Sequence, residues 1–281
     1  MKKTIIALCV AATMPLAYAE TVSVDLDLEE VSELNDAPDP GDHTKVSTMV
    51  GATYGVQGAG EGNNQMVEFV GQMSGAKDSG NLFLALGQVT GREGASGEDS
   101  SFELSKLRGR YFEVTQTGSE LFPMAGISLD YIETGMTDGL TERLVAVGGV
   151  VRATTPADNW LAFPIVAAVY AQNDDSLSGL PKGYVDSNAW GMQVNLMNSI
   201  YLHENGTHIQ INPQYTSLDM GGQLGTVNTL QLDMALQAPL SKDRKHWGKI
   251  TYTEFFDDAA RNSIHHNDQV REIKFTYNYF M

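Results

Sequence analysis

The sequence predicts an all-β fold: a transmembrane antiparallel up-and-down β-barrel of about 12 strands, an even number as is usual for such barrels. Three observations indicate this fold. Segments in which every second residue is apolar recur along the chain, and this period of two places the apolar residues on one face of a strand. The connections between the segments alternate between short and long, as in barrels that span a membrane. The chain also ends within an alternating segment.

The N-terminal residues have the three parts of a secretory signal peptide. Lys2 and Lys3 are followed by an apolar stretch at 5–14, and an A-x-A cleavage site stands at 17–19. The apolar stretch is too short to cross a bilayer as a helix, which takes roughly 20 residues. We therefore expect a cleaved signal peptide over 1–19 and export of the mature chain.

Residues 20–45 form an acidic stretch, with nine acidic residues and a single lysine. Pro38 and Pro40 interrupt any regular element in its second half. We expect a flexible periplasmic arm here, followed by the barrel over 46–281. Alternating apolar residues at 22–28 leave open a short strand or a plug in the lumen.

From Lys45 onward, the apolar and polar residues alternate in segments that suit tilted strands crossing a bilayer. A secreted β-sandwich would also alternate, but the connections and the final segment favour the barrel. The expected segments are 46–56, 65–73, 80–90, 101–116, 122–133, 141–154, 158–172, 187–203, 207–219, 226–238, 246–256 and 269–281.

The connections support the barrel because short and longer connections alternate along the chain. If both ends of the barrel lie in the periplasm, the periplasmic connections are short and most outer ones are longer. The outer connection 221–225 is an exception, because it is as short as the periplasmic ones. Within the short connection 204–206, Asn205-Gly206 is a strong signal for a tight hairpin turn. The short set is 74–79, 117–121, 155–157, 204–206 and 241–245, and the longer set is 91–100, 173–186 and 257–268.

The segment at 101–116 fits the pattern least well. Lys106, Arg108 and Arg110 would share a strand face with the apolar Phe112. Either a β-bulge near Gly109 changes the phase of this strand, or its boundaries differ from those expected.

The last segment carries a more specific signal. A row of aromatic residues on the lipid side suits a closed barrel, whose last strand pairs with its first and whose rim holds an aromatic girdle. This ending resembles the C-terminal signal of Gram-negative outer-membrane β-barrel proteins, which usually ends in Phe where this chain has Met281. The resemblance implies an outer-membrane location, contact with outer-membrane lipid, and recognition of Ile273–Met281 by the barrel-assembly machinery. The residues on the alternating face are Ile273, Phe275, Tyr277, Tyr279 and Met281.

Composition excludes several classes of function. A formal net charge of −17 argues against binding to nucleic acid and gives a weak bias toward cations as solutes. Cys9, the only cysteine, falls in the expected signal peptide, so we expect neither disulfides nor thiol chemistry.

No catalytic pattern accompanies the predicted fold. The six histidines form no HExxH motif, and no G-x-S-x-G elbow is present. His265 and His266 stand near aspartates in an expected outer loop, where a solvated polar loop is a simpler interpretation than a divalent-ion site. We expect no cofactor, no metal and no enzymatic activity; an enzyme that modifies membrane lipid is the least favoured alternative.

Polar residues that face the interior are the candidate functional residues. A basic ladder facing acidic groups would set up a field that filters polar solutes, although the same residues could instead pair and close the barrel. We favour a porin-like channel for small polar solutes. The alternative is a non-conducting barrel that binds a partner through its outer loops or acidic arm. The candidates are Lys106, Arg108, Arg110, Asp130, Arg152, Asp233 and Lys249.

Overall fold

The computed structural model describes part of the chain in detail. The predicted signal peptide, most of the acidic arm and the pair His265–His266 lie outside the described residues. No helix in the described part is long and apolar enough to span a membrane. The described residues are 38–42, 45, 47–59, 62–93, 102–134, 141–173, 181–257 and 271–281.

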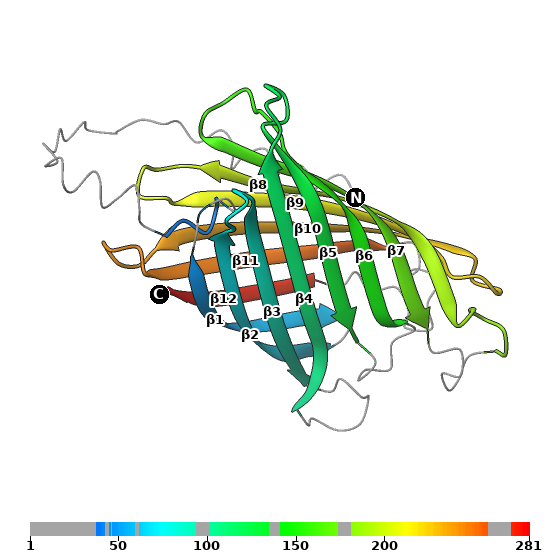
Figure 1. The fold of residues 1–281 in the computed structure, drawn as a ribbon. Coiled ribbons are helices and arrows are strands. Elements are labelled where there is room, and N and C mark those ends of the chain that lie inside the picture. Colours follow the sequence, from blue (N-terminus) through cyan, green and yellow to red (C-terminus); the bar gives the residue numbers. More distant parts are fainter. Residues whose placement is uncertain are drawn as a thin grey trace, which may run out of the picture. The chain divides into compact units, whose positions relative to one another are not determined.

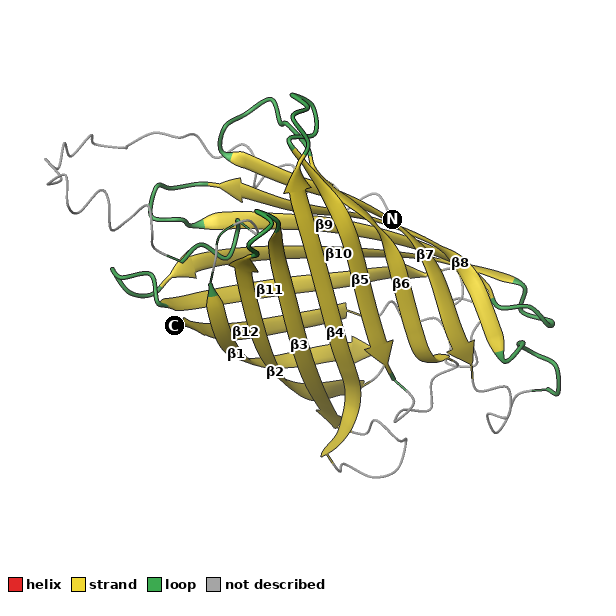
Figure 2. Ribbon diagram, in the orientation of Figure 1, coloured by secondary structure: helices red, strands yellow, loops and turns green. Residues whose placement is uncertain are grey.

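Twelve strands, each paired with its neighbours in the chain, close into one antiparallel barrel (Figure 1). The described residues form strands, turns and loops only (Figure 2). The predicted all-β, twelve-stranded up-and-down barrel is confirmed. The strands are β1 Thr48–Ala59, β2 Gly62–Ala76, β3 Leu82–Glu93, β4 Phe102–Gln116, β5 Met124–Glu133, β6 Thr141–Arg152, β7 Trp160–Asn173, β8 Asn188–Tyr201, β9 His208–Asp219, β10 Thr226–Pro239, β11 His246–Asp257 and β12 Arg271–Phe280.

The C-terminal strand closes the barrel. β12 pairs with β1 in a register that sets Phe280 opposite Met49. Across this seam, the hydroxyl groups of Thr53 and Thr276 are 2.9 Å apart. Pairing of the last strand with the first leaves no free sheet edge, which a strand in lipid could not tolerate.

The outer face carries a belt of exposed apolar side chains, as contact with lipid requires. On β12, Ile273, Phe275 and Tyr277 are 48%, 55% and 46% exposed. The lipid-facing assignment of the last segment is therefore correct for these residues. Exposed apolar residues elsewhere on the belt include Phe69, Val147, Val166, Trp190, Met192, Val194, Leu230, Leu236 and Ile250.

The interior is partly apolar. Val150 of β6 packs with Phe163 and Ile165 of β7, and all three are buried. Phe112 and Met197 pack against this cluster from β4 and β8. Apolar packing therefore fills the lumen beside β6 and β7, which leaves the open space beside the other strands.

The predicted β-bulge near Gly109 is wrong. β4 pairs with β3 in one continuous register from Lys106 onward. The irregularity lies before it, where Thr90 pairs with Lys106 and Gly91 with Leu104, so that Ser105 is the extra residue on β4. Lys106 therefore shares the inner face with Phe112. No change of phase is needed, because Phe112 meets the apolar part of the interior and not lipid.

The two ends of the barrel differ. We call the end that holds the start of β1 and the end of β12 the turn end, and the opposite one the loop end. The expected length difference holds for the loop-end connections after β3, β7 and β11, but those after β1, β5 and β9 are no longer than the turns. At the turn end, Arg244 donates to the carbonyl of Glu204 and so ties two neighbouring turns together.

Candidate functional site

The candidate site is a cavity of about 640 Å³ inside the barrel. Inner residues of β1 to β4 and of β8 to β12 supply almost all of its wall. The glutamines Gln57, Gln72, Gln88, Gln210 and Gln237 contribute to it from five different strands. Neutral polar side chains on this wall can exchange hydrogen bonds with water and solutes, as porin interiors do.

Basic side chains outnumber acidic ones on the cavity wall, six to three. This balance is the reverse of the whole chain, whose formal net charge is −17. The cation bias suggested by the total charge therefore does not describe the wall. The basic set is Arg92, Lys106, Arg108, Arg110, Lys249 and Lys274, and the acidic set is Glu68, Asp233 and Glu272.

Two arginines of β4 converge on one buried carboxylate of β5. Arg108 donates through Nε to Asp130 Oδ1 at 2.9 Å and through its Nη2 to Oδ2. Arg110 donates through Nη2 to Oδ2 at 2.7 Å. The strand register explains this arrangement, because Asp130 lies directly opposite Arg110 on the inner face. A buried carboxylate needs such partners, since burying a charge alone is costly.

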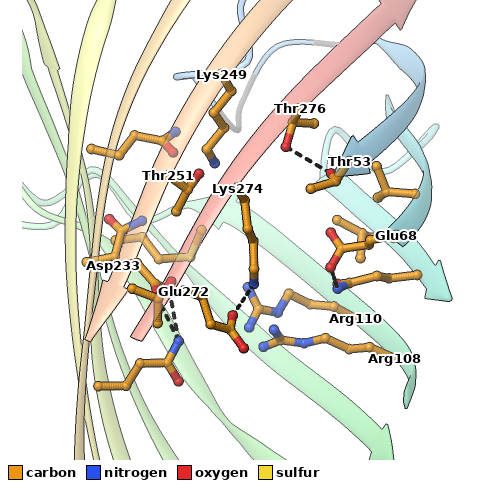
Figure 3. Close-up of a pocket in the computed structure, with 18 of the residues that line it drawn as sticks. Thr53, Glu68, Arg108, Arg110, Asp233, Lys249, Thr251, Glu272, Lys274 and Thr276 are labelled. Atoms are coloured by element: carbon orange, nitrogen blue, oxygen red, sulfur yellow. Dashed lines mark hydrogen bonds and ion pairs between the residues drawn. The ribbon is translucent and has the colours of Figure 1, made fainter. Parts of the chain in front are cut away.

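A second carboxylate, on β12, also binds two cations. Glu272 is buried, and its Oε1 accepts from Arg92 Nη2 at 3.2 Å. Its Oε2 accepts from Lys274 Nζ at 2.6 Å. In Figure 3, Lys274 extends toward Glu272, and Arg108 and Arg110 extend from β4 toward the same region.

The other two acidic groups accept hydrogen bonds from neutral donors. Gln88 Nε2 donates to Glu68 at 2.5 Å. Thr253 Oγ1 and Gln231 Nε2 donate to Asp233 at 2.7 and 3.0 Å. These two carboxylates form no ion pair with a described lysine, although both keep their negative charge.

Comparisons with known proteins address the fold. No protein-family model and no curated protein matches the sequence. An outer membrane channel from Pseudomonas putida F1, known as a crystal structure, matches with a TM-score of 0.57 and 11% identity, over 87% of this chain and 100% of that one. The chain has the fold of an outer-membrane β-barrel. This fold and the apolar outer belt together place the protein in the outer membrane, as its C-terminal strand predicts.

Two further solved barrels are less similar. The KdgM porin matches with a TM-score of 0.45 and 8% identity, over 82% of this chain and 98% of its own. The translocator domain of the autotransporter NalP from Neisseria meningitidis matches with a TM-score of 0.48 and 12% identity, over 89% of this chain and 94% of its own.

The structure brings most of the predicted site residues of this outer-membrane barrel together. Six of the seven lie in or beside the cavity: five line it, and Asp130 binds two of those five. Arg152 points inward opposite Met124 near the turn end, but it is not part of the cavity wall. The five lining residues are Lys106, Arg108, Arg110, Asp233 and Lys249.

The site prediction omitted four charged residues of the cavity wall, namely Glu68, Arg92, Glu272 and Lys274. Arg92 lies beyond the expected segment 80–90, because β3 extends to Glu93. Glu272 precedes Lys274 by two residues, so the period of two already placed it on the inner face. An ion pair between strands far apart in sequence gives no local signal, which is why this pair was missed.

The turn-end mouth of the barrel is narrowed by residues that precede β1. Tyr201 donates its hydroxyl hydrogen to Asp39 Oδ2 at 2.9 Å, and Asp39 Oδ1 accepts from the Gly41 amide at 2.9 Å. A Cβ on Gly41 would lie only 2.8 Å from Tyr201 Oη, so the backbone passes very close. Pro40, which lies between Asp39 and Gly41, lines the lumen cavity. We call residues 38–42 the mouth segment.

Aromatic rings continue this narrowing around the turn end. The rings of Tyr201 and His208 are 5.4 Å apart, those of His208 and Trp247 are 6.2 Å apart, and those of Trp247 and Phe280 are 6.4 Å apart. The row runs over β8, β9, β11 and β12 on the inner side. The mouth segment and this row together occupy part of the lumen at the turn end.

Removing the contact between Tyr201 and the mouth segment is expected to raise conductance. Tyr201→Phe deletes one hydrogen bond to a carboxylate, which is worth roughly 1.5–3 kcal/mol, and so frees the segment more often. The measurement is mean single-channel current in a planar bilayer. Tyr215→Phe is the matched control, because Tyr215 donates to Asn228 at 2.9 Å on the exposed outer face. Equal currents in wild type and Tyr201→Phe would show that the segment does not restrict passage.

Proposed function

We propose that this protein is a porin-like channel through which small polar solutes diffuse across the outer membrane. The observation that carries the proposal is the polar cavity of about 640 Å³ within a closed barrel. Passage would depend on the shape and the electrostatic field of the lumen, with no bond made or broken. The fold shared with the Pseudomonas channel is consistent with this function.

The division of the interior supports a narrow passage. Apolar packing of Val150, Phe163 and Ile165 fills the side beside β6 and β7. The remaining space is bordered by charged and amide side chains that water can solvate. A twelve-stranded barrel is wider than the side-chain-filled eight-stranded kind and narrower than large porins, which suits small solutes.

A non-conducting barrel is the second candidate, and the turn end favours it. The mouth segment and the aromatic row narrow that opening, so the barrel would conduct only if enough space remains beside them. Such a protein would act by binding a partner. In both cases we propose that Ile273–Met281 is the segment that the barrel-assembly machinery recognises.

Single-channel recording of the refolded mature protein separates these two candidates. A heat-dependent gel shift first establishes that the barrel has folded. The proposed function predicts discrete current steps in a planar bilayer with potassium chloride on both sides. A folded barrel that inserts but passes no current would overturn the channel and favour the binding role.

A further inference from the structure

We infer that the lumen holds a binding site for the oxyanion of a small solute, a carboxylate or a phosphate, around Lys106 of β4 and Lys249 of β11. The inference rests on the proposed channel function and specifies the class of solute that the channel prefers. Three features of the described lumen wall support it. They are the unequal ion pairing, two lysines that form no ion pair with a described residue, and arginine N–H groups that are not used in ion pairs.

The first feature is that each paired carboxylate is shared by two cations. Asp130 binds both Arg108 and Arg110, and Glu272 binds both Arg92 and Lys274. Each group of three therefore carries one positive charge that its own members do not balance. This surplus of positive charge favours an added anion.

The second feature is the pair of lysines that project from the wall. Among the described residues, neither Lys106 nor Lys249 has an ion-pair or hydrogen-bond partner. Lys106 lies within electrostatic range of Lys274, Glu68, Arg108 and Glu272, and so near members of both groups of three. Lys249 is within range of Asp233, Glu68 and Lys274. Half-buried ammonium groups near other cations favour an added anion.

The third feature is the donor capacity left on the arginines. A guanidinium carries five N–H donors in a planar fork. Arg110 uses Nε and Nη2 on Asp130, which leaves its other N–H groups for a ligand. Arg92 Nε is buried and has no partner among the described residues. Forked donors match the two oxygens of a carboxylate or phosphate better than they match chloride.

The acidic residues offset only part of this positive charge. Glu68 and Asp233 keep their negative charge while they accept hydrogen bonds from Gln88, Gln231 and Thr253. Even when the buried Asp130 is counted with the three acidic wall residues, six basic residues outnumber four acidic ones, so the local field attracts anions although the whole chain is acidic. A charge acts on a permeating ion mainly over about 8–10 Å in physiological salt, so the wall outweighs distant loops.

The test is the reversal potential of refolded channels in a potassium chloride gradient, followed by addition of acetate or phosphate at constant chloride. Wild type is expected to prefer chloride over potassium, and the added oxyanion is expected to reduce the chloride current. If both acetate and phosphate reduce the chloride current, the site binds the oxyanion group that they share. If only one of them does, that oxyanion is the preferred class of solute.

The decisive variant is the double substitution Lys106→Gln and Lys249→Gln, because these lysines have no ion pair or hydrogen bond within the described part of the chain. It is expected to lower the anion preference severalfold and to abolish the block by oxyanions, with conductance steps retained. Lys182→Gln with Lys242→Gln is the matched control, since it removes two exposed loop lysines outside the cavity wall. The control is expected to behave as wild type.

The outcomes separate the two levels of the proposal. Folded wild-type protein without current steps contradicts the channel itself. Channels that open but prefer potassium, or whose selectivity and oxyanion block are unchanged in the double variant, contradict only the oxyanion site and leave the channel standing.

Discussion

Replacing Phe275 with arginine is expected to destabilise the barrel by roughly 2–4 kcal/mol, the cost of placing such a charge on the lipid face near the bilayer centre. Phe275 lies midway along β12 and is 55% exposed on the outer belt. The measurement is urea-induced unfolding of the protein in lipid vesicles, followed by the heat-dependent gel shift.

The neighbouring residue provides the matched control. Thr276 lines the lumen cavity, so Thr276→Arg places the same charge in a polar interior. It is expected to cost much less than Phe275→Arg, although it adds charge close to Lys249, its partner in the β11 register. Equal destabilisation by both variants would contradict the assignment of the two faces of β12 and with it the membrane-spanning orientation.

Replacing Gly148 with alanine is expected to prevent normal folding or to destabilise the barrel by at least about 1–3 kcal/mol, the usual range for overpacking. A Cβ at this position would lie 2.0 Å from the Val166 carbonyl oxygen and 2.5 Å from Ala167 Cα. Backbone atoms of a paired strand cannot move aside without shifting β7 itself. Glycine here permits the close approach of the β6 and β7 backbones.

Gly87→Ala is the control for this second variant. No atom lies within 4 Å of a Cβ built on Gly87, which is also in the middle of a strand. Gly87→Ala should lower the free energy of unfolding only slightly. The yield of folded barrel, measured by the heat-dependent gel shift, should match wild type. If Gly148→Ala refolds with the same yield and the same urea midpoint as Gly87→Ala, this result would contradict the close approach of β6 and β7 at Gly148.

The fold could be predicted because successive residues of a barrel strand face lipid and lumen alternately, so residue type alternates with them. Ile273, Phe275 and Tyr277 alternate with lumen-facing residues, and each of the three is exposed to the outside as expected. β4 was harder, because Phe112 is apolar and faces inward. A period of two gives the face of a residue but does not say whether the interior at that point is polar or apolar.

The site was only partly predictable for a related reason. Inward parity identified Lys106 and Lys249, but it could not show that Arg92 of β3 would meet Glu272 of β12, 180 residues later in the chain. The contact of Asp39 with Tyr201 is equally non-local. The total charge also misled, because it counts every acidic residue of the chain, whereas the described cavity wall is mainly basic.

Cysteine accessibility during single-channel recording tests the central claim, a water-filled path through the lumen, most directly. The chain has no cysteine after Cys9, so Thr251→Cys and Ile250→Cys each introduce a single thiol into protein produced without the predicted signal peptide 1–19. Thr251 lines the cavity, whereas Ile250 is 50% exposed on the outer belt. A charged, membrane-impermeant thiol reagent is expected to reduce the current of Thr251→Cys in a discrete step and to leave Ile250→Cys unchanged. Failure of the reagent to alter the current of an open Thr251→Cys channel would contradict a conducting path along this cavity.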